Sequence, residues 1–165
     1  MIVWLVVVLS LSGFSGVGGG SASPAQTIGQ GVTVTPASGW VSAQDVWNVG
    51  PNAVSLKHGG ALVAFAADAF SGTTQQLLDD QLSSTQQQFG SFRTLPVGST
   101  TVAGGRSALK VLFSGTSNSS DLEGELVAVA TGQTGVVMLA IAPAGQIAQL
   151  QGDLDSMLNG LVIPR

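Results

Sequence analysis

His58 is the only histidine of the 165-residue chain, and it stands in the segment Leu56–Ala61, LKHGGA. A Ser-His-Asp hydrolase would need this imidazole as its general base, because histidine exchanges a proton near neutral pH. No serine lies in a nucleophile-elbow motif, and the segment Gly115–Ser120, GTSNSS, is typical of a polar loop. A hydrolase that uses His58 is therefore a minor alternative, and we expect a solvated turn residue.

Three carboxylates alternate along the segment DLEGE, at Asp121, Glu123 and Glu125. In an extended strand, residues two apart share one face, so these side chains could together offer oxygen ligands to Ca²⁺ or Mg²⁺. The spacing of a calcium loop is absent, and we predict no metal site and no cofactor. The sequence favours cross-strand pairing with the basic residues Arg106 and Lys110.

Asp79 and Asp80 are adjacent, and a carboxylate pair could in principle act as the acid and base of a glycosidase. On a helix, neighbouring side chains point about 100° apart, which favours a solvated face and an interaction with the helix dipole. The same segment is rich in glutamine. We interpret this cluster as an exposed, amide-rich surface made of Gln75, Gln76, Gln81 and residues 86–88.

Trp47 is the candidate binding residue, because tryptophan combines a large apolar ring with an N–H donor and is enriched at interfaces. The competing interpretation is that Trp47 packs in the core. A second tryptophan, Trp40, ends the segment VTVTPASGW. Pro36 ends strand pairing there and Gly39 frees the backbone, so we expect the Trp40 ring to fold onto the sheet as a lid.

The charge balance excludes several classes of partner. The chain carries five basic and nine acidic residues, a formal net charge of −4, and its basic residues are scattered. Nucleic acid is therefore not an expected partner, because binding a phosphate backbone needs clustered Lys and Arg. The absence of cysteine excludes disulfides, thiolate metal sites and lipid attachment at a lipoprotein cysteine.

The N-terminal segment carries no charged side chain before Asp45. Ile2–Leu11 is almost wholly apolar, which is shorter than the roughly 20 residues of a membrane span and typical of a signal-peptide core. No basic residue precedes it, so residues 2–20 could instead be an uncleaved anchor. We predict a hydrophobic signal peptide or N-terminal membrane anchor over residues 1–25, a linker over 26–30 and a domain over 31–165. The glycines that follow the apolar run lack the G-x-G-x-x-G spacing of a dinucleotide-binding loop.

Hydrophobic periodicity predicts strands, a helix, further strands and a final helix. The short turns between strands imply antiparallel pairing and hence an α+β class. The first helix starts with a capping box at Thr73 and Gln76 and stops at Gly90. Its apolar stripe consists of Leu78, Leu82, Phe89 and Phe92. The second helix lies between Pro143 and Gly160, with a stripe of Ile147, Leu150, Leu154, Leu158 and Leu161. The strands are expected near 32–35, 53–57, 61–66, 93–102, 107–115, 122–130 and 136–141.

The segments VTVTPASGW, TVAGGRSALKVLFSGT, EGELVAVA and GDLDSMLNGLVI, in this order, resemble the PsbP-like family. The resemblance covers about Gly31 to Val162. It implies an α/β/α sandwich with a central antiparallel β-sheet and flanking helices. The family includes a lumenal photosystem accessory protein, a nuclear-transport Ran-binding factor and exported actinobacterial members of unknown function. It has no shared catalytic residues to carry over.

From the leader and the resemblance we expect an exported, cell-envelope-associated binding or accessory domain that interacts with a protein partner and is not an enzyme. Its location would be extracytoplasmic, either secreted or anchored through residues 2–20. The alternative is a carrier of a small apolar ligand or lipid. Its pocket would lie between sheet and helix and would be lined by residues such as Phe65, Phe70 or Trp47.

Overall fold

The computed structural model describes residues 23–165, so most of the predicted leader lies outside the described residues. The described chain forms ten strands, two α-helices and one 3₁₀ turn. In chain order these are β1 (Gln26–Thr27), η1 (Gly29–Gly31), β2 (Thr33–Val34), β3 (Val41–Ser42), β4 (Ala53–His58), β5 (Ala61–Ala69), α1 (Thr74–Gln86), β6 (Gly90–Thr94), β7 (Gly98–Val102), β8 (Arg106–Ser117), β9 (Ser120–Thr131), β10 (Thr134–Pro143) and α2 (Ile147–Asn159). Within this range no helix is both long and apolar enough to cross a bilayer.

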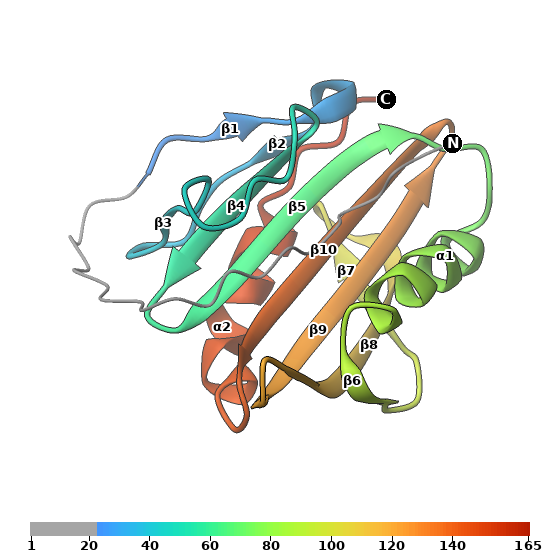
Figure 1. The fold of residues 1–165 in the computed structure, drawn as a ribbon. Coiled ribbons are helices and arrows are strands. Elements are labelled where there is room, and N and C mark those ends of the chain that lie inside the picture. The colour runs from blue at the N-terminus through green and yellow to red at the C-terminus, as the bar shows by residue number, and fades with distance from the viewer. Residues whose placement is uncertain (1–22) are drawn as a thin grey trace.

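One antiparallel sheet organises the domain. Its eight strands follow the order β3-β4-β5-β10-β9-β8-β6, and β7 also pairs with β8. Helix α1 lies in front of the sheet and α2 behind it (Figure 1). This arrangement confirms the predicted α+β class, with a central antiparallel sheet between flanking helices.

Strands β5 and β10 are apolar on both faces over most of their length, because the sheet is covered on both sides. On β10, Val136, Met138 and Ala140 belong to the cluster under α2, whereas Val137 and Leu139 belong to the cluster under α1. Two-residue turns join β4 to β5, β8 to β9 and β9 to β10. The segment predicted as a polar loop is one of them, because Asn118 and Ser119 adopt φ values of 49° and 64° and close the β8–β9 hairpin in two residues.

Helix α1 starts as predicted. The Thr73 side chain accepts from the Gln76 backbone, and the Gln76 side chain accepts from the Thr73 backbone, which together form a capping box. The helix ends at Gln86, before the predicted stop at Gly90. Phe89 and Phe92 therefore do not continue the helical stripe; they follow the helix and pack their rings against each other at a centroid distance of 6.2 Å.

The residues predicted as a linker, 26–30, belong to the folded domain, so that prediction is wrong. Strand β1 pairs with β2, and Ile28 is buried in the cluster under α2. The backbone N–H of Ile28 donates to the Val32 carbonyl at 2.8 Å. A buried isoleucine among small polar residues fixes this segment, because burying one such side chain contributes about 2 kcal/mol.

Trp40 is the predicted lid. Its ring is fully buried on the α2 side, and the preceding Gly39 has a φ of +85°, a value that L side chains rarely adopt. The indole Nε1–H donates to Asp153 of α2 at 2.9 Å. The ring stacks on His58 at a centroid distance of 5.4 Å. Trp40 therefore links the strand edge to α2, as a structural residue of the core.

Gly124 of β9 stands opposite Phe113 of β8, and the Phe113 ring lies against its Cα. A Cβ at this position would overlap that ring and lie 2.5 Å from the Ala140 carbonyl oxygen. Gly124→Ala is expected to lower the free energy of unfolding by about 2 kcal/mol or more, measured by urea unfolding followed by tryptophan fluorescence. Gly98→Ala on β7 is the matched control, because nothing lies within 4 Å of its added Cβ, and its effect should stay within about 0.5 kcal/mol. Equal losses in the two variants would contradict this packing.

Asp153→Ala would leave the buried Nε1–H of Trp40 without an acceptor. We expect this variant to lower the free energy of unfolding by about 1–3 kcal/mol, the cost of an unsatisfied buried donor. Asp153→Asn keeps an acceptor oxygen and should lose less. If both variants unfold at the same urea concentration as the wild type, Trp40 does not depend on this bond.

Candidate functional site

In the described part of the structure, His58 contacts residues of the fold and no candidate catalytic residue. The residue is exposed at the end of β4, where its Nδ1 lies 3.0 Å from the Gly39 carbonyl oxygen and its ring stacks on Trp40. Within residues 23–165, no hydrogen bond joins His58 to a serine, threonine or carboxylate. The chemistry of a Ser-His-Asp hydrolase therefore gains no geometric support here.

The acidic residues of β9 share one face, as predicted, but they do not form ion pairs with Arg106 and Lys110. In the register of β8 and β9, Glu123 stands opposite Ser114, and Glu125 stands opposite Leu112. The expected cross-strand pairs are therefore wrong, because the register places neutral residues opposite both acids. Across the described range, no group of three or more acidic or histidine side chains could hold a metal ion.

Glu123 fixes the start of α2. One carboxylate oxygen accepts the Ile147 backbone N–H at 2.6 Å, whereas the N-cap residue Gln146 makes no side-chain cap. A carboxylate at a helix N-terminus is favourable because it meets unpaired N–H groups and the positive end of the helix dipole. Sequence patterns could not have found this cap, because the capping residue comes from a strand over twenty residues earlier.

Glu125 is fully buried on the same face, and neither carboxylate oxygen has a hydrogen-bond partner within 3.5 Å. Burial raises the pKa of its carboxyl above the ordinary value of 4.5, while Lys110 and the Gln151 amide, at longer range, oppose this rise. A buried carboxyl is favoured in its neutral form. Near neutral pH, the burial of the Glu125 carboxyl therefore lowers the free energy of unfolding.

Two predictions about α1 need correction. Gln81 is fully buried, not exposed, because it lies on the same helical face as Leu77, Leu78 and Thr85. The acidic pair does not serve the helix dipole. Asp79 and Asp80 are exposed but lie beyond the first turn, which contains no acidic residue. Asp79 accepts instead from the Gln75 side chain at 2.9 Å.

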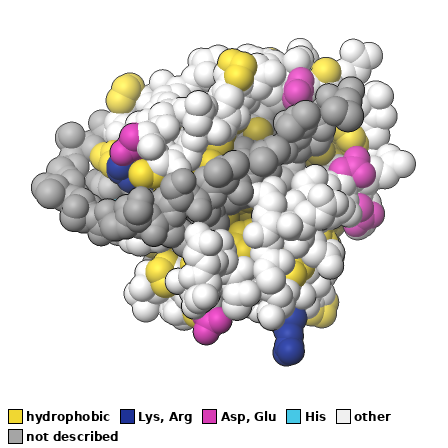
Figure 2. Space-filling view, in the orientation of Figure 1, with side chains coloured by type: hydrophobic (Ala, Val, Ile, Leu, Met, Phe, Trp, Pro, Cys, Tyr) yellow, Lys and Arg dark blue, Asp and Glu magenta, His cyan; other side chains and the backbone are white. Residues whose placement is uncertain are grey.

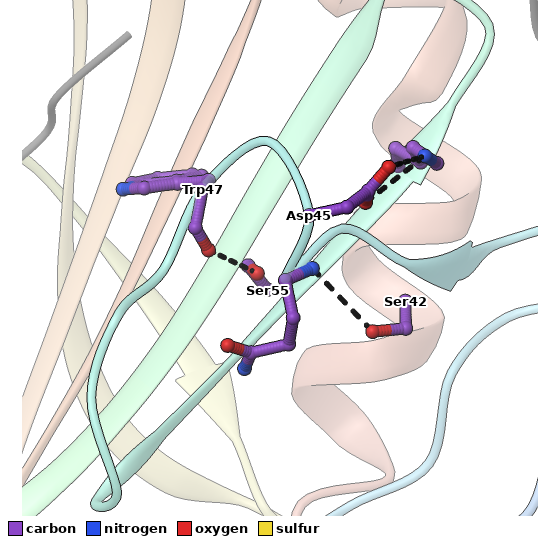
Figure 3. A network of polar contacts seen from close by, with 6 residues as sticks. Ser42, Asp45, Trp47 and Ser55 are labelled. Carbon is purple, nitrogen blue, oxygen red and sulfur yellow. Dashed lines mark hydrogen bonds and ion pairs between the residues drawn. The ribbon is translucent and has the colours of Figure 1, made fainter. Parts of the chain in front are cut away.

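Trp47 lies in the core on the α1 side of the sheet, with only 1% of its surface exposed. Its backbone carbonyl accepts the Ser55 hydroxyl at 2.7 Å, and the adjacent turn is fastened by an ion pair between Asp45 and Lys57 at 3.0 Å (Figure 3). The interpretation of Trp47 as a core residue fits this position. A buried ring offers no surface to a partner, so the candidate binding role has no support.

The apolar pocket expected for a lipid carrier does not assemble from the predicted residues. Phe65 is buried in the cluster on the α2 side, whereas Trp47 and the half-buried Phe70 belong to the cluster on the opposite side of the sheet. Side chains on opposite faces of one sheet cannot line a common cavity.

A groove that sequence reasoning missed lies between the edge strand β6 and the start of α2. We call it the edge groove. Its volume is about 370 Å³, and its lining comprises Arg93, Thr94, Leu95, Leu112, Phe113, Ser114, Glu123, Gly124 and Ile147. The outer wall on β6 is exposed to solvent, whereas the inner wall is apolar, with Leu112 half-buried and Ile147 buried.

Exposed aliphatic side chains continue the apolar surface of the edge groove along the chain after β6. Leu95 is 59% exposed and Val97 is 44% exposed, and together with Val162 they are the exposed large hydrophobic residues of the described chain. Arg93 and Glu123 place one charge of each sign along the same groove. The groove thus combines an apolar floor, a hydrophobic rim and polar anchors, which is the composition of a contact surface.

The buried carboxyl makes stability depend on pH. Because the folded-state pKa of Glu125 is raised, the folded protein holds this proton more tightly than the unfolded chain. The unfolding free energy therefore falls as pH rises above about 4.5. Glu125→Gln, which cannot ionise, is expected to be more stable than the wild type at pH 7. This gain should shrink as pH falls toward 4.

The control is Glu123→Gln, on the same face of the same strand, which should be less stable than the wild type at pH 7 by about 0.3–1 kcal/mol because α2 loses a charge at its N-terminus. Urea unfolding at several pH values measures both variants. A gain in Glu125→Gln that is constant with pH would contradict the role of ionisation.

Comparison with known proteins identifies the fold. The sequence matches no protein-family model and no curated protein. The solution structure of cyanobacterial PsbP from Synechocystis sp. PCC 6803 is similar with a TM-score of 0.61 and 10% identity, over 93% of this chain and 99% of that chain. The Ran-binding protein Mog1p of Saccharomyces cerevisiae has a TM-score of 0.60 and 11% identity, over 87% and 96%. A protein of unknown function from Pseudomonas aeruginosa, PA94, has a TM-score of 0.53 and 15% identity, over 69% and 82%.

The similarities to PsbP and Mog1p cover 93% and 87% of this chain, and they agree with the resemblance predicted from the sequence. At such low identity they establish the fold and carry no residue roles. The chain therefore has the PsbP-like fold that is also found in Mog1p.

Proposed function

We propose that this protein is an exported, envelope-associated accessory domain that binds a protein partner through the edge groove and catalyses no reaction. The partner would insert an apolar side chain between Leu95 and Ile147. Polar groups of the partner would meet Arg93 and Glu123 at the sides of the groove.

The observation that carries this proposal is the exposure of Leu95 and Val97 on a sheet edge. Exposed edge strands usually carry charges or are covered, because their free N–H and C=O groups can pair with another chain. Here two exposed aliphatic residues follow the edge strand β6 beside the groove, and Arg93 is the one charged residue of that strand. Contiguous apolar surface rimmed by polar residues is typical of a protein contact.

Further support comes from three sources. Mog1p, which has the same fold, is a Ran-binding protein. The apolar run Ile2–Leu11 and the low charge of the chain favour export. On the face shown in Figure 2, few acidic or basic side chains are visible among the described residues, in keeping with the low charge of the chain.

A protein fits the edge groove better than an enclosed small ligand does. Pockets for small apolar ligands usually bury most of the ligand surface. The β6 wall of this groove is open, because Arg93, Thr94 and Leu95 are all exposed. A partner that covers the edge strand would bury this wall together with Val97.

The proposal is tested by placing a photoreactive amino acid at position 95 in the full-length protein and irradiating intact cells. We expect one discrete protein adduct in the envelope fraction. Position 162 is the matched control, because Val162 is 60% exposed and Leu95 is 59% exposed, yet Val162 does not line the groove.

The captured protein is then purified and its affinity measured against two variants. Leu95→Ser should raise the Kd by about tenfold or more, as expected for a contact at the centre of an interface. Val162→Ser should leave the Kd unchanged. The same adducts at both positions, an adduct confined to the cytosol, or equal Kd values would each overturn the proposal.

A further inference from the structure

A second pocket is lined by residues of the β9–β10 hairpin and the C-terminal segment, at the opposite end of β9 from the edge groove. The hairpin and the C-terminus lie at the top of Figure 1. We call this second pocket the arginine pocket. Its volume is about 550 Å³, and it is open to solvent at Gln30, Gln133 and Arg165. Its lining comprises Gln30, Arg106, Thr131, Gly132, Gln133, Thr134, Pro164 and Arg165.

The charges of this pocket are unbalanced. Two of the five basic residues of the chain, Arg106 and Arg165, line it, and no aspartate or glutamate does. The ion pair found in residues 23–165 joins Lys57 to Asp45, so neither arginine is neutralised by a carboxylate side chain. In a chain with a net charge of −4, two guanidinium groups without a carboxylate side-chain partner in one pocket favour an anionic ligand.

The fold positions these groups from three distant segments. Arg106 begins β8 and donates from Nη2 to the Ile163 carbonyl at 3.3 Å, which orients the guanidinium toward the C-terminal segment. That segment is fixed to β2 by paired backbone bonds between Thr33 and Val162, of 2.9 and 3.0 Å. Thr131 stands opposite Thr134 in the β9–β10 register. Strands β8, β9 and β10 therefore hold one side of the pocket, and the backbone bridge to β2 holds the C-terminal side.

The remaining lining is neutral and rich in hydrogen-bonding groups. The amides of Gln30 and Gln133 and the hydroxyls of Thr131 and Thr134 can each donate and accept. Guanidinium groups bind phosphate or carboxylate in a bidentate manner, and amides and hydroxyls suit the hydroxyl groups of a sugar. We propose that the arginine pocket binds a small sugar that carries a phosphate or carboxylate group. This site goes beyond the proposed partner contact and does not depend on it.

The test is calorimetric titration of the full-length protein with four probes: glucose 6-phosphate, glucuronate, glucose and inorganic phosphate. We expect glucose 6-phosphate or glucuronate to bind and glucose not to bind, because glucose lacks the anion. Comparison of the two charged sugars identifies which anion is preferred. Inorganic phosphate should bind at least tenfold more weakly than the preferred sugar, because it cannot use the amide and hydroxyl wall.

Two variants locate the binding. Arg165→Gln, at a residue that has no hydrogen bond to the rest of residues 23–165, and Arg106→Gln should each raise the Kd of the preferred sugar by about tenfold or more. Arg93→Gln, which makes the same charge change in the edge groove, should leave it unchanged. Arg106→Gln also removes the bond to Ile163, so thermal unfolding checks that this variant is folded. If the Arg106 variant is unfolded, the result for Arg165→Gln decides.

Three results would overturn the proposal. They are the absence of binding by both charged sugars, binding of inorganic phosphate as tight as that of the sugars, and an affinity that falls equally in Arg93→Gln and Arg165→Gln. Amide NMR shifts of Gln30 and Gln133 on addition of the preferred sugar provide an independent measurement, and their absence would place any bound sugar elsewhere.

Discussion

The double burial of strand β10 is the constraint on which the rest of the structure depends. This strand pairs with β5 on one edge and β9 on the other, and both of its faces lie under apolar clusters. A strand in that position has no room for polar side chains, so its neighbours must supply apolar cover on two sides. Polar groups that could recognise a ligand are therefore displaced to the ends and the outer edge of the sheet, where the edge groove and the arginine pocket lie.

Helix α2, which covers one face of the sheet, is fixed in place by two acidic residues. From the sequence alone, both would be expected on the surface. Asp153 receives the Trp40 indole, and Glu123 receives the first backbone N–H of α2. Both bonds connect α2 to segments distant in sequence. In each, a carboxylate accepts from an N–H group that would otherwise have no partner. In a chain with nine acidic residues, this use of carboxylates inside the fold leaves fewer of them for surface chemistry.

Local signals predicted the parts of the fold that depend on neighbours in the chain. The capping box at Thr73, the Gly39 turn before Trp40 and the apolar run of β10 are all present in the structure. Features set by distant contacts could not be predicted. Ile28 is buried because β1 pairs with β2, and a linker would have no such partner. Gln81 is a different case, because helical periodicity places it on the buried face of Leu77 and Leu78, and only its polar side chain favoured an exposed position. The edge groove draws residues from four elements, each of which is ordinary by itself.

The exposed rim of the edge groove follows from the lengths of the strands. Strand β8 has twelve residues, whereas β6 and β7, which share its outer edge, have five each. The chain must leave the ladder between them, and it does so at Leu95, Pro96 and Val97. Leu95 keeps one bond, from its N–H to the Leu112 carbonyl at 2.9 Å, while Pro96 has no N–H to offer. The side chains at this break cannot join either face of the sheet, so a hydrophobic rim is exposed beside the groove, at the place where the edge is free to accept a partner.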